Sequence, residues 1–187
     1  MNKYHNQSTY WDRVSSGKEF STQLQIDLFA NYVSKDARVL DHGCGYGRTL
    51  HELQEDGYTN LYGTDSSPKM IARAAQELSN ITLAVSDGEH IPFASESFDA
   101  VMLIAVLTSV IENEAQQKMI SELKRVLKPS GYIYINDFLL NQNERNISRY
   151  KQFQGLYVEY GVYYPRELCA GIIVQSGSSI CSRTFNL

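Results

Sequence analysis

A glycine-rich turn, DHGCGYG at residues 41–47, is the segment of the sequence best suited to binding chemistry. It follows an apolar run and precedes a stretch with helical periodicity. Glycine lets the backbone turn sharply and approach a ligand closely, and the first turn of a helix offers unpaired N–H groups. The turn therefore predicts a loop that binds a polar part of a ligand, although a turn of this kind can also be purely structural.

The glycines are spaced G-x-G-x-G, at positions 43, 45 and 47. The dinucleotide fingerprint G-x-G-x-x-G would need glycine at position 48, where this sequence has Arg48. No Tyr-x-x-x-Lys pair is present either. Both observations disfavour a nicotinamide-dependent oxidoreductase.

Two acidic residues follow the next two apolar runs. Asp65 can accept hydrogen bonds from two ribose hydroxyls, which requires a carboxylate with two oxygens. Asp65 could instead cap the following helix, unless Ser66 or Ser67 does so and leaves the carboxylate free. Asp87 precedes a glycine, Gly88, and could accept from an adenine amino group, but alone it is an ordinary acidic turn. The set indicates a ligand that contains adenosine.

Two periodicities of apolar residues alternate along the chain and define the elements that must position these residues. They predict strands at 38–42, 60–65, 81–85, 98–106 and 131–137, and helices at 47–55, 68–78 and 113–127. Strands joined by crossover helices give a Rossmann-like, doubly wound, mostly parallel α/β sheet with helices on both faces. Ligands of such sheets bind beyond the carboxyl ends of the strands, where all the residues discussed above are expected.

Length and composition favour a single domain of 187 residues. Residues 1–36 are predicted to form a helical cap at one edge of the site, 37–140 the cofactor-binding core and 141–187 an atypical, substrate-side tail. The helical cap is expected to contain one or two helices, with apolar residues at helical spacing between Phe20 and Tyr32.

The charge balance and the reactive residues exclude several function classes. A formal net charge of −4 without a basic run argues against nucleic acid and against an anionic membrane as partners. No apolar run reaches the roughly 20 residues of a spanning helix, and no signal peptide is recognisable, so a cytoplasmic location is expected. The three cysteines have no CxxC spacing and the four histidines are scattered, so neither disulfides nor a metal is predicted. The sequence does not indicate an oligomeric state.

Four segments resemble, in order, the class I S-adenosylmethionine-dependent methyltransferases: VLDHGCGYGRTL, LYGTDSSPKMIARA, SDGEHIPFASESFDAVMLIAVL and ELKRVLKPSGYIYIND. The resemblance covers about residues 38–138, with Ser130 where the family usually has glycine. It implies S-adenosylmethionine as cofactor, S-adenosylhomocysteine as product and methyl transfer by in-line displacement to a small-molecule acceptor. The cofactor-binding residues that it implies are Asp41 near the methionine amino group, Gly43, Gly45 and Gly47 along the methionine and ribose, Asp65 at the ribose, Asp87 and Gly88 at the adenine, and also Cys44, Ser66 and Ile104. No general base is identified.

The segment after Pro165 departs from that family, which normally adds a helix and two further strands. One hypothesis is a hairpin of residues 171–175 and 180–185, which would supply shortened strands. The other is a shift of reading frame near residue 165, which would replace the last family segment and leave the substrate side incomplete. The alternative to an active methyltransferase is accordingly a non-catalytic protein that binds S-adenosylmethionine or a partner.

Overall fold

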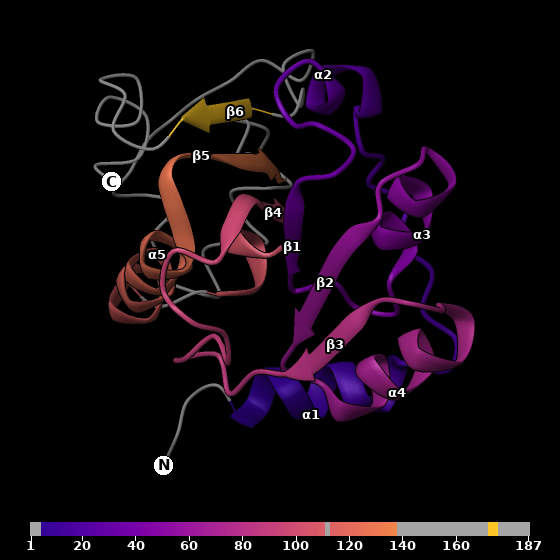
Figure 1. Ribbon diagram of the computed structural model, residues 1–187. Helices are drawn as coiled ribbons and strands as arrows, with labels where there is room; N and C mark the ends of the chain where they lie inside the picture. Colours follow the sequence, from indigo (N-terminus) through magenta and orange to yellow (C-terminus); the bar gives the residue numbers. More distant parts are fainter. Residues whose placement is uncertain (1–4, 111–112, 138–171, 176–187) are drawn as a thin grey trace, which may run out of the picture.

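The computed structural model describes residues 5–110, 113–137 and 172–175 (Figure 1). Its strands are β1 (Arg38–His42), β2 (Asn60–Asp65), β3 (Thr82–Val85), β4 (Phe98–Ile104), β5 (Leu127–Asn136) and β6 (Ile172–Gln175). Its helices are α1 (His5–Val14), α2 (Ile26–Ala30), α3 (Arg48–Glu55), α4 (Pro68–Glu77) and α5 (Asn113–Val126), with a 3₁₀ turn, η1, at Leu107–Ser109.

The six described strands form one sheet in the order β3-β2-β1-β4-β5-β6. Strands β1 to β5 pair in parallel, and β6 pairs antiparallel with β5. The order along the chain reverses between β1 and β4, so the predicted Rossmann-like, doubly wound sheet is confirmed. The carboxyl ends of β1 and β4 meet at this reversal, which is where such sheets bind ligands.

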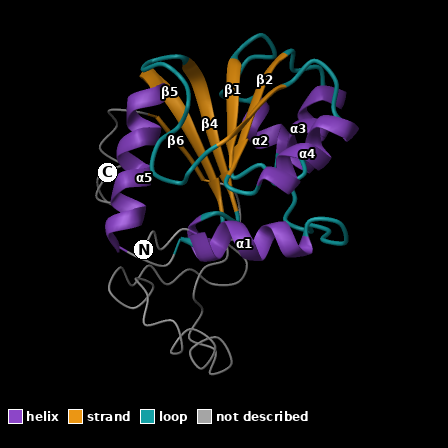
Figure 2. Ribbon diagram, turned by 90° about the horizontal axis from the view of Figure 1, so that it is seen from below, coloured by secondary structure: helices purple, strands orange, loops and turns teal. Residues whose placement is uncertain are grey.

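Alternation along the central strands builds a hydrophobic core on each face of the sheet. Ala100 and Met102 of β4 pack into one core with residues of α2 and α3, whereas Val101 and Leu103 pack into the other with residues of α5. Figure 2 shows this three-layer arrangement, with α5 on one side of the sheet, α3 and α4 on the other and α1 across one end. Burial on both faces explains why the strands read as continuous apolar runs.

Most predicted elements begin and end within two residues of the observed positions, and the two largest differences have a clear cause. Strand β4 ends at Ile104 rather than Val106, because Ala105 has a φ of +56° and turns the chain into η1. Strand β5 begins at Leu127 rather than Gly131, because Leu127 pairs with Phe98 ahead of a register shift.

The helical cap is only partly helical. Helices α1 and α2 form, but residues 18–25 between them have no helical structure and cross the molecule as an irregular segment. Side chains of the core, such as Tyr46 and Tyr134, make hydrogen bonds to its backbone amides. These bonds replace the helical ones that the spacing of Phe20 and Leu24 had predicted.

The tail lies largely outside the described residues. Of the predicted hairpin, the first strand is present as β6, and the second, at residues 180–185, falls outside the described part of the chain. The frame-shift hypothesis also concerns a region of which only residues 172–175 are described. Among the helices of the described ranges, none has the length and apolar content to cross a membrane.

Candidate functional site

A cavity of about 290 Å³ lies at the carboxyl ends of β1, β2 and β4, where the strand order reverses. Its walls come from the glycine turn after β1, the end of β2, the turns after β3 and β4, and one residue of α5, Met119. Residues 18–22 of the irregular segment and Trp11 of α1 complete it. Segments far apart in the sequence thus converge on one site.

The glycine turn is held in shape by the neighbouring strand. The backbone amides of Gly43 and Cys44 both donate to the carbonyl of Thr64, at 2.7 and 2.9 Å. Gly43 has a φ of +81°, and a Cβ there would lie 2.5 Å from the side chain of Val106. Gly45 has a φ of +57°, and a Cβ there would lie 2.5 Å from the ring of Phe20. Both positions therefore require glycine for conformation and for space.

Asp65 accepts two backbone hydrogen bonds at the end of β2. One carboxylate oxygen accepts from the amide of Gly45 at 2.9 Å, and the other accepts from the amide of Ser67 at 2.8 Å. Helix α4 is capped by Ser67, whose hydroxyl accepts from the amide of Met70 at 3.1 Å. Asp65 is therefore not the cap, and since a carboxylate offers about four acceptor positions, the remaining ones are available to the cavity that it lines. Burial raises the pKa of this carboxyl group.

Asp41 and Arg48 form the charged end of the cavity. Asp41 is only 2% exposed, and burial raises its pKa to about 7, opposed by the charge of Arg48 and reinforced by that of Asp65. Arg48 pairs with Glu52 and donates to the carbonyl of Thr22, while its Nε is buried without a hydrogen-bond partner among the described residues. An acid and a base of this kind can bind the ammonium and carboxylate groups of an amino acid.

Arg48 is a site residue that sequence reasoning missed, because the residue served only as evidence against a dinucleotide site. A signal was available. Arg48 is the first residue of α3, where the helix dipole disfavours a cation. A positive charge at that position is better explained by a ligand or a tertiary contact than by the helix itself.

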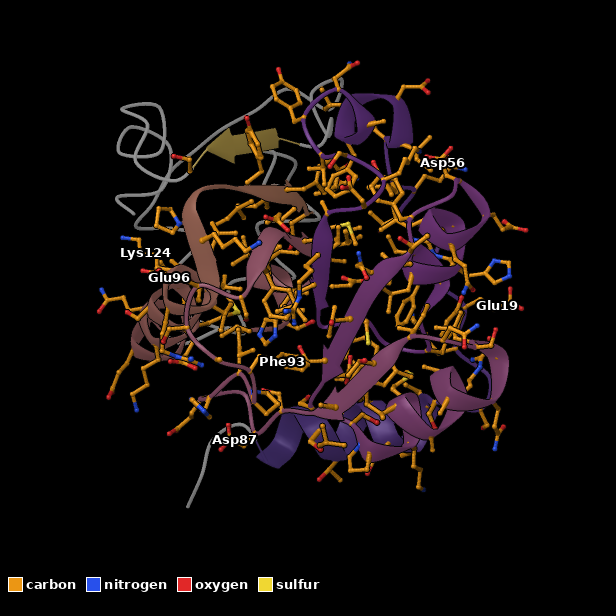
Figure 3. All side chains as sticks on the ribbon, viewed as in Figure 1. Glu19, Asp56, Asp87, Phe93, Glu96 and Lys124 are labelled. Carbon is orange, nitrogen blue, oxygen red and sulfur yellow. The ribbon has the colours of Figure 1, made fainter. Side chains whose placement is uncertain are left out.

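The turn after β3 contributes Ser86 and Gly88 to the cavity, but not Asp87. The carboxylate of Asp87 accepts from the amides of Glu89 and His90, at 2.9 and 2.8 Å, and the residue is exposed. Figure 3 shows its side chain at the periphery of the molecule. Ser86, which the sequence did not single out, is buried in the wall and donates to the carbonyl of His90 at 3.0 Å.

The remaining predicted residues divide in the same way. Cys44, Ser66 and Ile104 line the cavity, whereas Gly47, the N-cap residue before α3, is outside the lining. The Cys44 thiol is buried and burial raises its pKa well above the ordinary value, which suits a packing role. Ile104 adjoins an apolar wall formed by residues 105, 106, 110 and 119.

A sequence profile described as "Methyltransferase domain" matches residues 40–135. An uncharacterized methyltransferase of Bacillus subtilis is 36% identical over 104 residues, which is 54% of this chain and 42% of that protein. An uncharacterized methyltransferase of Synechocystis is 33% identical over 121 residues, which is 65% of this chain and 55% of that protein. The crystal structure of a SAM-dependent methyltransferase from Methanosarcina mazei has a TM-score of 0.61 and 28% identity, and the match covers 71% of this chain and 66% of that one. The chain spans about half the length of the curated relatives it matches.

Proposed function

Because the chain belongs to the methyltransferase domain family, we propose that it transfers a methyl group from S-adenosylmethionine to a small-molecule acceptor. The class I S-adenosylmethionine-dependent fold and the cofactor expected from the sequence are confirmed by the family match and by the Methanosarcina structure. The activity of the whole protein, its acceptor and a cytoplasmic location are parts of the proposal.

The observation that carries the proposal is the joining of Asp65 to Gly45 at the edge of the cavity. One hydrogen bond fixes the glycine turn against the acidic end of β2, so that backbone and carboxylate face the same space. The chemistry of the lining fits the cofactor. Buried carboxylates suit its ammonium and ribose groups, and glycines allow its close approach to the backbone.

Within this site we assign roles to residues of the chain. Asp41 binds the amino group and Arg48 the carboxylate of the methionine part, Asp65 accepts from the ribose hydroxyls, and Ser86 and Gly88 hold the adenine edge. Asp87 is exposed, lies outside the lining of the cavity and accepts two hydrogen bonds from its own turn, so we expect it to contribute little.

The bound cofactor supplies a methyl group on a positively charged sulfur, which is transferred in line to a nucleophile. The protein contributes by positioning the acceptor at roughly 3 to 3.5 Å from the methyl carbon and by excluding water. The apolar wall of Ile104, Val106, Val110 and Met119 suits both tasks. The net charge of −4 supports a small molecule over a nucleic acid as the acceptor.

Calorimetric titration of the full chain with S-adenosylmethionine and with S-adenosylhomocysteine tests the proposal. We expect micromolar binding by the wild type and a loss of at least about 100-fold in D65A, since two backbone amides and two ribose hydroxyls lose their acceptor. D56N is the matched control, because Asp56 is an exposed acid paired with Lys35 away from the cavity.

Two results would contradict the cofactor assignment: no binding by a folded wild type, or equal binding by D65A. Transfer is then tested by incubating the chain with methyl-labelled cofactor and pools of small molecules, followed by extraction. Label that appears only in RNA or in protein would refute a small-molecule acceptor.

A further inference from the structure

Arg73 of α4 lies outside the lining of the cavity and contacts the segment that forms one of its walls. We call residues 15–25 the N-terminal strap. One nitrogen of the Arg73 guanidinium donates to the carbonyls of Ser15 and Lys18, at 3.0 and 2.9 Å. Its Nε donates to Glu77, one turn further along α4, at 2.8 Å. The guanidinium thus holds two points of the strap to a core helix.

The same guanidinium begins a stack of three groups that ends at the glycine turn. Its carbon lies 3.9 Å from the centre of the Tyr46 ring, and that ring stacks on Phe20 at 5.2 Å with an angle of 6° between the planes. The Tyr46 hydroxyl accepts from the backbone amide of Phe20 at 3.2 Å. Phe20 in turn packs against Gly45, so Arg73 determines how closely the strap lies on the turn.

The strap, unlike Arg73 and Tyr46, faces the cavity directly. Lys18, Phe20 and Thr22 belong to its lining, and Trp11 of α1 packs edge-on against Phe20 at 5.9 Å. Between residues 19 and 24 the strap has no backbone hydrogen bonds of helix or strand type, whereas at its two ends the amide of Lys18 donates to the carbonyl of Val14 and the amide of Phe29 donates to the carbonyl of Gln25, both at 3.0 Å. A segment held mainly by side chains from elsewhere can open locally without unfolding the sheet.

We propose that Arg73 is a positioning residue that latches the N-terminal strap over the cofactor site and so controls cofactor exchange. The identity of the ligand rests on the proposed function, but the latch itself can be tested without ligand. A cofactor enters while the strap is open and is retained while it is closed, so the apparent affinity scales with the closed fraction. Arginine suits this role because its planar fork donates to two carbonyls and stacks on a ring at the same time.

The ligand-free experiment is hydrogen exchange of the full chain, followed by mass spectrometry. In R73A we expect exchange to rise at least about 10-fold in residues 15–25 and to stay unchanged in β1 and β4, because the strap loses its two charge-assisted hydrogen bonds from Arg73. R73K keeps the charge and should recover part of the protection. E77Q removes the charge beside Arg73 but keeps an oxygen that can accept from its Nε, and K69A removes an exposed charge from the same helix. Exchange in the strap of both variants should match that of the wild type.

The ligand arm uses stopped-flow fluorescence with S-adenosylhomocysteine. Trp11 is the single tryptophan of the chain and lies in the cavity wall, so it reports binding directly. In R73A we expect dissociation about 10-fold faster, with association as fast as in the wild type or faster. A variant that merely damages the fold would bind more slowly instead.

Three outcomes separate the hypotheses. The latch is supported if R73A, but neither E77Q nor K69A, shows faster hydrogen exchange confined to the strap together with faster dissociation of S-adenosylhomocysteine. Unchanged exchange in the strap, or a rise spread equally over the sheet, would overturn it. A local rise in exchange together with no binding by the wild type would support the latch and refute the proposed function.

Discussion

Asp41 is the residue whose ionisation the fold changes most clearly in the site. Burial raises its pKa from 3.8 to about 7, whereas in the unfolded chain the group titrates at its ordinary value. Between these two pH values the folded protein binds a proton that the unfolded chain does not. The free energy of unfolding therefore falls as the pH rises from 3.8 to about 7, and the loss is complete above that range.

Replacing Asp41 by asparagine should consequently stabilise the protein at pH 8, and by only about 40% of that amount at pH 5, which lies nearer the lower of the two pKa values. At 1.36 kcal/mol for each pH unit, the gain at pH 8 is at most about 4 kcal/mol, and each kcal/mol raises Tm by about 2–4 °C. The check is a comparison of thermal melts of D41N and wild type at both pH values. The same variant should bind S-adenosylmethionine at least about 10-fold more weakly, because it lacks the charge opposite the amino group.

An equal change in Tm at pH 5 and pH 8 would contradict this account of Asp41. H51N serves as the control, since His51 is half exposed and pairs only with the exposed Glu55 on the outer side of α3.

At the level of single residues, the sequence located the site better than it assigned the roles within it. Asp41 and Asp65, the acids after β1 and β2, both line the cavity, because strand ends in a parallel sheet meet at one edge. Asp87 lies outside the lining, since a carboxylate that follows a strand can bond to its own turn instead. For Arg48 the only signal was its unfavourable place at the start of α3, since its contact with Thr22 depends on a distant segment. Ser86 gave no signal, because a serine that bonds within its own turn resembles any other turn serine.

Helix α5 is bonded to the segment after β3 through two charged side chains, Glu122 and Arg125. Glu122 accepts from the amide of Ile91 at 2.9 Å and pairs with Arg125, which donates to the carbonyls of Ile91 and Phe93 at 2.8 Å each. These bonds hold the segment that carries Phe93, seen in Figure 3, on the sheet. The hydrogen bond from Arg125, with the further contacts from Ile91 and His90, lowers the pKa of Glu122 to about 2.

Glu122 should therefore contribute stability above its ordinary pKa of 4.5, and this contribution should disappear as the pH falls towards 2. We expect the free energy of unfolding of E122Q to be about 1–3 kcal/mol lower than that of the wild type at pH 7, and this difference to be smaller at pH 3. Urea denaturation at both pH values measures the difference. E114Q is the control, because Glu114 lies on the same helix with its side chain 84% exposed. A deficit that is the same at both pH values would refute the electrostatic explanation.

The strands and their crossover helices were predictable because each has a clear apolar pattern, and because their backbones bond in regular ways, within a helix or between neighbouring strands. The strap was not, because its backbone is bonded by side chains of Arg48, Tyr134 and Asn136, which follow it by 26 to 113 residues. Helical spacing of apolar residues between Phe20 and Tyr32 shows only that these side chains are partly buried. It does not show which partner the backbone takes.

For the whole molecule, the net charge of −4 provides little electrostatic attraction to phosphate, which is the basis for proposing a small-molecule acceptor. We expect dissociation constants weaker than about 100 µM for bulk transfer RNA at physiological salt, measured by fluorescence anisotropy. A micromolar affinity that falls steeply with added salt would contradict the small-molecule proposal. A dissociation constant that does not depend on salt would point to a contact other than phosphate.

The doubly wound, mostly parallel sheet followed from the alternation of strands and helices, since crossover connections leave few topologies. The single domain with its cap, core and tail stays a prediction. The antiparallel pairing of β6 with β5 agrees with one strand of the predicted hairpin. No periodic signal could have decided between that hairpin and a changed reading frame.

The hydrogen bonds of the strap also determine when, during translation, the strap can fold. The carbonyl of Gln23 accepts from Asn136, and the amide of Gln25 donates to Tyr134, more than 100 residues later in the chain. Because translation adds about 5–20 residues per second, the strap is synthesised several seconds before Tyr134 and Asn136. The cofactor site is thus completed only when β5 leaves the ribosome, and binding of cofactor to a nascent chain would mark that moment.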